Sequence, residues 1–308
     1  MKFMVTGGAG FVGSHIVKKL CQQNHDVLVF DNLNTGKLSN LKDTENFLFI
    51  NGDIRNYKLL EESCNGINGI FHQAALASVP DSFKKPEEYY DVNVIGTENI
   101  FKIGKKMNIK IVYASSSSVY GNPISLPIKE SHPRNPLNPY GITKVDDEKL
   151  AEKYSSQGVK ITGLRYFNIF GENQSMTYAG VITKFLEQVK KRKAPKIFGD
   201  GKQLRDFVYV GDVVNANLKI MQSNINEKNF NVGSGKIISI NELAKMILEI
   251  SDLNVEPIHI ESLDGDVKAS QADIELIKKH TSWKPNIKLK NWLQQHIRKQ
   301  SKNNEFDL

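Results

Sequence analysis

The sequence predicts an α/β fold: a doubly wound parallel sheet with a smaller second α/β domain. Short apolar segments alternate with helical ones over the first half of the chain, a glycine-rich turn follows the first apolar segment, and the alternation loosens beyond about residue 168. With 308 residues, 40% of them hydrophobic, the chain can bury a sizeable core in about two domains. We therefore expect residues 1–167, together with about 205–222, to form the first domain, and residues 168–308 to form most of the second.

Each element is predicted from apolar runs and helix-end signals. The expected strands of the first domain are Phe3–Thr6, Asp26–Asp31, Phe47–Asn51, Gly69–Gln73, Lys110–Ser115 and Lys160–Tyr166. The expected helices are Phe11–Leu20, Pro86–Met107 and one opened by the N-cap and proline of Asn138-Pro139. The second domain is expected to hold a helix near Val181–Lys191, a strand Asp206–Val210, a helix opened by the Ser239–Glu242 capping box and a basic helix near Asn291–Lys299.

Composition excludes several classes of protein. The 41 basic and 34 acidic residues leave a net charge of +7, concentrated around 190–196 and at the C-terminal end, where solvated helix faces are expected rather than a nucleic-acid interface. No segment approaches the roughly 18 apolar residues of a membrane span, and the N-terminus lacks the apolar core of a signal peptide. Cys21 and Cys64 read as reduced thiols. We expect a cytoplasmic protein with neither nucleic-acid nor membrane partner, and no metal site.

The first motif that carries chemistry is the run Gly7–Gly13 between the first strand and the first helix. Gly7, Gly10 and Gly13 permit a tight turn and a close backbone approach, so that a pyrophosphate can lie on the helix N-terminus of a Rossmann-like domain. Asp31 ends the next strand, where a ribose-binding acid belongs, and its charge favours NAD over NADP. The alternative is that Asp31 only caps a turn.

Two further motifs suggest acid–base chemistry. Tyr140 and Lys144 are four residues apart, so their side chains share a helix face, and the ammonium favours the phenolate form of the tyrosine. Hydroxyl side chains at 115–118 follow the fifth strand and are expected at the crevice where such sheets bind ligands. A serine-rich loop that merely caps a helix is the alternative.

Together these motifs resemble the short-chain dehydrogenase/reductase superfamily, and the chain is similar to its extended branch, the NAD-dependent nucleotide-sugar epimerases and dehydratases. The closest likeness is to UDP-glucose and UDP-N-acetylglucosamine 4-epimerases. Further matching segments appear in order between residue 3 and about 290: Asp31–Leu33, Gly52–Ile54, His72–Ala75, Asn93–Thr97, Leu164–Asn168, Arg205–Phe207 and Asn231–Gly233.

The resemblance implies a role for each matching residue. Catalytic roles fall to Ser116, Tyr140 and Lys144. The NAD site is expected to comprise Gly7, Gly10, Phe11, Val12, Gly13, Asp31, Asn32, Asn34, Thr35, Gly36, Asp53, Ile54, Ala74, Ala75, Asn93, Ser115, Tyr140, Lys144 and Phe167. The UDP-sugar is expected to contact Ser116, Ser117, Tyr140, Asn168, Val181, Ile197, Phe198, Arg205, Asp266 and Ser270.

The implied reaction is 4-epimerisation of a UDP-hexose. Tyr140 takes the proton of the sugar 4′-hydroxyl while C4′ gives hydride to NAD, and the 4-keto sugar turns over before hydride returns. Lys144 holds the nicotinamide ribose, and Ser116 relays the proton. The resemblance also implies a homodimer through helices near 86–107 and 140–157.

Several alternatives stay open. Ser117 and Ser118 stand where dehydratases and UDP-glucuronate decarboxylases carry acids, so both reactions are disfavoured. A UDP-glucuronate 4-epimerase, another nucleotide-sugar epimerase or reductase, and an inactive NAD-binding protein remain. Leu263 departs from the family, which has a diphosphate-binding arginine there, and Lys268 is a candidate to compensate. The small Ser270 predicts room for an N-acetyl group, unless it faces solvent.

Overall fold

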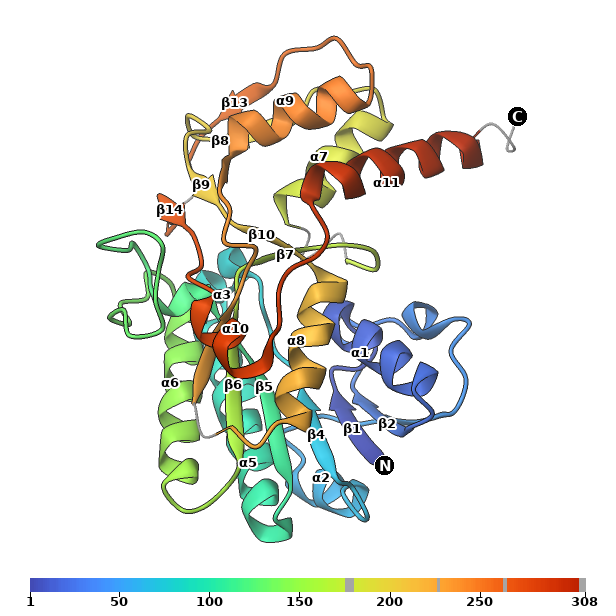
Figure 1. Ribbon diagram of the computed structural model, residues 1–308, viewed down its shortest axis with the longest axis vertical. Helices are drawn as coiled ribbons and strands as arrows, with labels where there is room; N and C mark the ends of the chain where they lie inside the picture. The colour runs from blue at the N-terminus through green and yellow to red at the C-terminus, as the bar shows by residue number, and fades with distance from the viewer. Residues whose placement is uncertain (175–179, 226–227, 263–264, 305–308) are drawn as a thin grey trace.

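Seven parallel strands form the main sheet, in the order β11-β6-β5-β4-β1-β2-β3 (Figure 1). The computed structural model describes residues 1–174, 180–225, 228–262 and 265–304. The strands of this sheet are β1 (Lys2–Thr6), β2 (Asp26–Asp31), β3 (Phe47–Asn51), β4 (Gly69–His72), β5 (Lys110–Ser116), β6 (Ile161–Tyr166) and β11 (Asn229–Val232). The predicted α/β fold with a doubly wound parallel sheet is confirmed.

Helices cover both faces of the sheet. Successive strand residues point to opposite faces, so Phe3 and Val5 of β1 join one apolar core while Met4 joins another. The first core is closed by α1 (Phe11–Gln22), α8 (Val210–Gln222) and α10 (Glu275–Thr281). The second is closed by α2 (Tyr57–Ser63), α5 (Gly96–Met107) and α6 (Pro139–Ser155). The remaining helical segments of this part are η1 (Leu38–Leu41), α3 (Val79–Lys84), α4 (Pro86–Tyr90), the π-helical turn η2 (Asp91–Ile95) and η3 (Ser117–Val119).

A second, smaller part lies at one end of the main sheet (Figure 1). Its apolar core is formed by α7 (Val181–Lys190), α9 (Ile240–Ile250) and α11 (Leu289–Asn304). Three small sheets accompany these helices. Their strands are β7 (Asn168–Phe170), β8 (Lys196–Phe198), β9 (Leu204–Arg205), β10 (Phe207–Tyr209), β12 (Ile238–Ser239), β13 (Ile258–Ile260) and β14 (Ala269–Ser270).

The helix-end signals of the sequence are present as hydrogen bonds. Asn138 Oδ1 accepts from the Gly141 N–H at 2.8 Å, and the capping box of Ser239 and Glu242 is complete. The expected strand Asp206–Val210 is shorter, because Val210 is already the first residue of α8. β11 supplies the seventh strand of the main sheet although it lies within the 168–308 segment. No described helix combines the length and apolarity needed to cross a membrane.

Candidate active site

The glycine-rich turn brings the backbone of three segments close together. Gly7 has a φ of +66°, and a Cβ there would stand 2.7 Å from the Ala74 nitrogen after β4. A Cβ on Gly13 would collide with the Gly7 carbonyl oxygen. Gly10 precedes α1 and offers no side-chain cap, so N–H groups of the first turn are free for an anion. This turn therefore fits a dinucleotide pyrophosphate.

Asp31 is held by the backbone of this turn. Its Oδ2 accepts from the Ala9 N–H at 2.9 Å and its Oδ1 accepts from the Leu33 N–H at 2.8 Å. Burial raises the pKa of Asp31, and the two backbone donors oppose that rise. The turn-capping role is thus present, and the same carboxylate still lines the cavity described next.

A single cavity of about 1270 Å³ runs from the glycine-rich turn to α6. It brings together most of the residues proposed for NAD and for catalysis. Those that line it are Gly7, Gly10, Phe11, Val12, Gly13, Asp31, Asn32, Asn34, Thr35, Gly36, Asp53, Ile54, Ala74, Ala75, Ser115, Ser116, Ser117, Tyr140, Lys144, Phe167 and Asn168.

Asn93 was expected to line the cofactor site but is fully buried behind its wall. Its side chain bonds both backbone groups of Leu76, at 2.8 and 3.0 Å, and also the Thr143 hydroxyl at 3.0 Å. It therefore braces the segment after β4 against α6 instead of facing the cavity. Asn93 lies in the π-helical turn η2, where it is one of two buried residues.

The residues proposed for the UDP-sugar do not all share that cavity. Asn168 also lines a smaller cavity of about 150 Å³ with Val181. Among the described residues proposed for the UDP-sugar, those that line neither cavity are Ile197, Phe198, Arg205, Asp266 and Ser270. Leu263 lies outside the described residues.

Arg205 and Ser270 are neighbours on paired strands. They face each other in the register of β9 and β14, and Arg205 Nη2 lies 2.5 Å from Asp266 Oδ1. Buried Asp206 fixes this arrangement by accepting from the N–H groups of Ser234 at 2.6 Å and Ala272 at 3.0 Å. Ser270 is 7% exposed, so it does not face solvent.

Tyr140 and Lys144 lie on one side of α6, as their spacing predicts, and both line the large cavity. The cap at Asn138 places Tyr140 in the first turn of the helix, with Lys144 one turn later. Lys144 Nζ lies 2.9 Å from Asp147 Oδ2. Burial alone would lower the pKa of Lys144, but the Asp147 carboxylate and the Tyr140 side chain outweigh it, and the pKa is raised.

Ser116 ends β5 and caps the short helix η3. Its Oγ accepts from the Ser118 N–H at 3.1 Å and lies 3.1 Å from Ser118 Oγ. The capping role considered for the serine run is therefore present. Ser116 nevertheless lines the same cavity as Tyr140, and its hydroxyl contacts Ser118 within the run.

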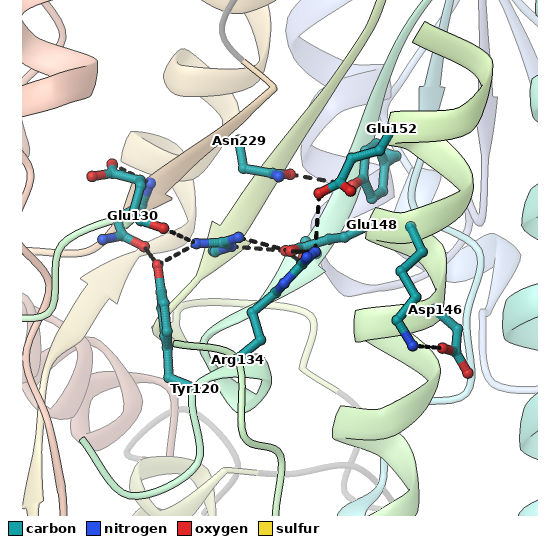
Figure 2. Close-up of polar contacts among 12 residues, drawn as sticks. Tyr120, Glu130, Arg134, Asp146, Glu148, Glu152 and Asn229 are labelled. Carbon is teal, nitrogen blue, oxygen red and sulfur yellow. Dashed lines mark hydrogen bonds and ion pairs between the residues drawn. The ribbon is translucent and has the colours of Figure 1, made fainter. Parts of the chain in front are cut away.

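A buried ionic network supports the segments that carry Ser116 and Tyr140 from behind. Glu148 accepts from Nε and Nη2 of Arg165 at 2.8 and 2.7 Å, and from Ser115 Oγ at 2.7 Å. Figure 2 shows Arg134 reaching both Glu148 and Glu152 on this side of α6. The network ties β5, β6 and α6 together.

Some lining and supporting residues escaped the sequence analysis. Arg55 lines the cavity and forms a two-point ion pair with Asp53, at 2.9 and 2.7 Å, which lowers the pKa of Asp53 to about 2. In the sequence, this ion pair is indicated only by the spacing of two residues between Asp53 and Arg55 after the third strand. Asp147 was also missed, although a carboxylate three residues after a lysine on a helix is a recognisable pair. Gln73 and Tyr166, which bond each other at 3.2 Å, also line the cavity.

Comparison with known proteins decides the family. A family profile described as "NAD dependent epimerase/dehydratase family" matches residues 3–233. The chain belongs to this family. It is an enzyme family that depends on NAD, so the cofactor predicted from Asp31 and the glycine-rich turn is confirmed.

Individual relatives match nearly the whole chain. A protein of Methanocaldococcus jannaschii named "Putative UDP-glucose 4-epimerase" is 42% identical over 98% of this chain and 99% of its own length. The UDP-glucose 4-epimerase of Thermotoga maritima, solved with UDP-glucose, is 35% identical with a TM-score of 0.94, covering 98% of this chain and 99% of that one. The UDP-N-acetylglucosamine 4-epimerase of Methanobrevibacter ruminantium, solved with UDP-N-acetylmuramic acid, is 36% identical with a TM-score of 0.91, covering 96% and 97%.

Proposed function

We propose that this family member epimerises a UDP-hexose whose sugar carries no charge, at C4′ and through a transient 4-keto sugar. The observation that carries the proposal is one cavity that joins the dinucleotide-binding turn to Ser116, Tyr140 and Lys144. Bound NAD would supply the hydride acceptor and donor. Tyr140 would take and return the proton of the 4′-hydroxyl, Ser116 would bridge the phenol and the sugar oxygen, and Lys144 would favour the phenolate.

The acids around the cavity support epimerisation over dehydration. The described lining contains Asp31, Asp53 and Glu88. Asp31 is held by backbone donors, Asp53 by Arg55, and Glu88 lies 3.1 Å from Lys85. Elimination of water needs a free acid or base beside the catalytic hydroxyl, where this chain has Ser117 and Ser118. An epimerase needs no acid or base beyond the tyrosine.

The cations around the cavity support an uncharged sugar. Those in the described lining are Lys37, Arg55 and Lys144. Arg55 is engaged by Asp53 and Lys144 by Asp147, while the Lys37 backbone is bonded to Ala9 at the glycine-rich turn. A glucuronate carboxylate beside Tyr140 would thus face one cation, already paired. UDP-glucuronate is therefore the less favoured substrate.

The proposed substrates include UDP-N-acetylglucosamine as well as UDP-glucose. The support is the small side chain of Ser270, buried next to Arg205, and the substrates named for the Thermotoga and Methanobrevibacter relatives. A tyrosine at 270 would fill space that an acetamido group needs. Arg205 and Asp266, which form an ion pair, are the proposed contacts to the nucleotide. If Arg205 exchanged Asp266 for a phosphate group, its guanidinium would still have an anionic partner.

We also infer a cytoplasmic homodimer. Its support is apolar surface on the helices named from the sequence: Tyr90, Ile95 and Ile142 are 47%, 40% and 49% exposed. The molar mass in solution of the Tyr90→Glu and Ile142→Glu variants tests that contact. A dimer that persists in both variants would exclude this face as the dimer interface.

The test of function is product analysis. The protein is incubated with UDP-glucose, UDP-N-acetylglucosamine and UDP-glucuronate, and epimers are identified by NMR while NADH fluorescence is followed. We expect epimers of the two uncharged sugars and no net NADH. Net NADH would indicate a dehydrogenase, epimerised glucuronate would select that alternative, and NAD binding without turnover would indicate an inactive binder. Ser270→Tyr should remove only the acetylated substrate; equal loss of both excludes Ser270 as the gate.

A further inference from the structure

Asp147 is a buried acid that the proposed reaction does not use. It lies on α6 and is fully buried, and among the described residues its Oδ1 has no hydrogen-bond partner. Its Oδ2 is bonded to one group, the Lys144 ammonium at 2.9 Å. The side chain of Lys144 is itself only 4% exposed. The two charges therefore form a buried pair in the wall of the cavity, and the Thr97 hydroxyl is the neighbouring polar group that also favours the charged form of Asp147.

Stability does not account for this pair. A buried ion pair repays the cost of removing two charges from water only when further hydrogen bonds satisfy both groups. Asp147 leaves one carboxylate oxygen unbonded, so its desolvation is poorly compensated. A small apolar residue at 147 would instead leave the Lys144 ammonium buried without this partner. The carboxylate must therefore be explained by what it does to Lys144.

Two effects on Lys144 follow from the geometry. The hydrogen bond fixes the ammonium on the cavity side of α6, where Tyr140 also lies. The negative charge also keeps the ammonium protonated in a site where burial alone would release the proton. We propose that Asp147 is a positioning residue that holds Lys144 charged and aligned toward the bound dinucleotide. This rests on the proposed role of Lys144.

Other ionisable groups also face the pair and would act on its titration. They lie on α6 itself, on β4 and on β5: Tyr140, Glu148, His72 and Tyr113. His72 is neutral in this environment, because burial lowers its pKa to about 3 and the charge of Lys144 acts in the same direction. Tyr113 is neutral too, because burial raises its pKa. Glu148 is bound by Arg165. Asp147 is thus the acid in direct contact with the lysine.

The substitution Asp147→Asn keeps the shape and removes the charge. Because an opposite charge within about 4–6 Å shifts a pKa by 1–3 units, Lys144 in this variant should lose its proton at least about one pH unit lower. NAD⁺ affinity should then begin to fall at a correspondingly lower pH than in the unchanged protein, and the alkaline limb of the kcat/KM profile should move with it. The matched control is Asp146→Asn, since the neighbouring Asp146 pairs with Lys149 at 2.9 Å on the helix surface (Figure 2).

NAD⁺ affinity is measured by titration calorimetry between pH 7 and 11, because the pKa of Lys144 is raised above its ordinary value and burial raises the pKa of Asp147 to about 6. The proteins compared are the unchanged protein, Asp146→Asn, Asp147→Asn, Lys144→Met and the double variant Lys144→Met/Asp147→Asn. We expect the pH step to move in Asp147→Asn alone, to vanish in Lys144→Met, and the double variant to behave as Lys144→Met. A profile of Asp147→Asn that superimposes on the unchanged one overturns the proposal. If Asp147→Asn fails to fold by circular dichroism, Asp147→Ala, which leaves no polar atom to bury, takes its place. Because the readout is cofactor binding, it stays interpretable even if none of the UDP-sugars is turned over, an outcome that would reject only the proposed function.

Discussion

Ser115 Oγ donates a hydrogen bond of 2.7 Å to Glu148 Oε1, and this buried bond joins the end of β5 to the middle of α6. Ser116 follows directly on β5, and Lys144 precedes Glu148 by one helical turn. The segments that carry the proposed catalytic groups are thus fixed to each other by a carboxylate outside the cavity. The geometry of the site depends on a network whose central acid, Glu148, lies outside the described cavity lining.

Breaking this network should destabilise the fold. Arg165→Met leaves Glu148 buried without its two-point partner, and such a loss typically costs about 3–5 kcal/mol of the free energy of unfolding. Arg134→Met is the control, because the Arg134 side chain is 28% exposed and its ion pairs are worth about 1 kcal/mol at most. Urea denaturation compares the two. Equal losses of unfolding free energy in the two variants would show that Arg165 is not the principal partner of Glu148.

Tyr140→Phe should lower turnover by at least about 10²-fold, since a general acid–base group typically contributes 10²–10⁴-fold. NAD binding should change little, because only the hydroxyl is removed. The control is Tyr57→Phe on α2, whose hydroxyl donates to Glu61 and which lies outside the described cavity lining. Turnover is measured by epimer formation, and near-normal activity of Tyr140→Phe would place the base elsewhere.

NAD should bind at least about tenfold more tightly than NADP, a difference of about 1.4 kcal/mol. The reason is the Asp31 carboxylate at the end of β2, which repels a 2′-phosphate and accepts from ribose hydroxyls. Asp31→Asn should reduce the ratio of NAD affinity to NADP affinity, whereas Asp26→Ala at the exposed start of the same strand should not. Fluorescence titration with both dinucleotides measures it. Tighter NADP binding by the unchanged protein would reject this role for Asp31.

His72 should make folding stability fall on acidification. Its ring is buried between the Thr6 hydroxyl at 2.7 Å and the Thr97 hydroxyl at 2.9 Å, and burial lowers its pKa to about 3 from 6.5. The unfolded chain therefore takes up a proton between about pH 6.5 and 3 that the folded protein does not. The stability is fully present above pH 6.5 and is lost below it, by up to about 1.4 kcal/mol per pH unit.

Chemical denaturation across this pH range tests the effect. His72→Gln should flatten the dependence by that amount, while His259→Gln, at an exposed position, should leave it unchanged. Identical slopes in all three proteins would mean that another buried group dominates the acid response.

The sequence alone was sufficient for elements whose local signals agree with their packing. The strands β1 and β2 are apolar on both faces because helices cover both, and the proline and asparagine at 138–139 mark the start of α6 directly. β11 could not be assigned, since Asn229–Val232 is short and its partner, β6, is more than sixty residues away. Only the assembled sheet supplies that information.

The site was predictable to a similar degree. Residues that follow a strand end or share a helix face, such as Asp31 and the pair Tyr140 and Lys144, line the large cavity as expected. Asn93 differs, because its contacts with Leu76 and Thr143 are made across the packed structure and the sequence does not reveal them. Asp147 was overlooked because an acid near a lysine on a helix usually faces solvent, and only the packing of α6 buries this one.

The placement of α8 and β11 also constrains how the chain can be recombined. A fragment cut after Phe167 would leave β6 as an open edge and expose the apolar face that Val213 and Val214 cover. A chimaera that joined residues 1–167 of this chain to the C-terminal part of a relative would take its edge strand and helix from the relative. Those foreign elements would then have to pack against this sheet. A working chimaera must instead carry 210–222 and 229–232 together with the N-terminal part, because these segments complete its sheet and its core.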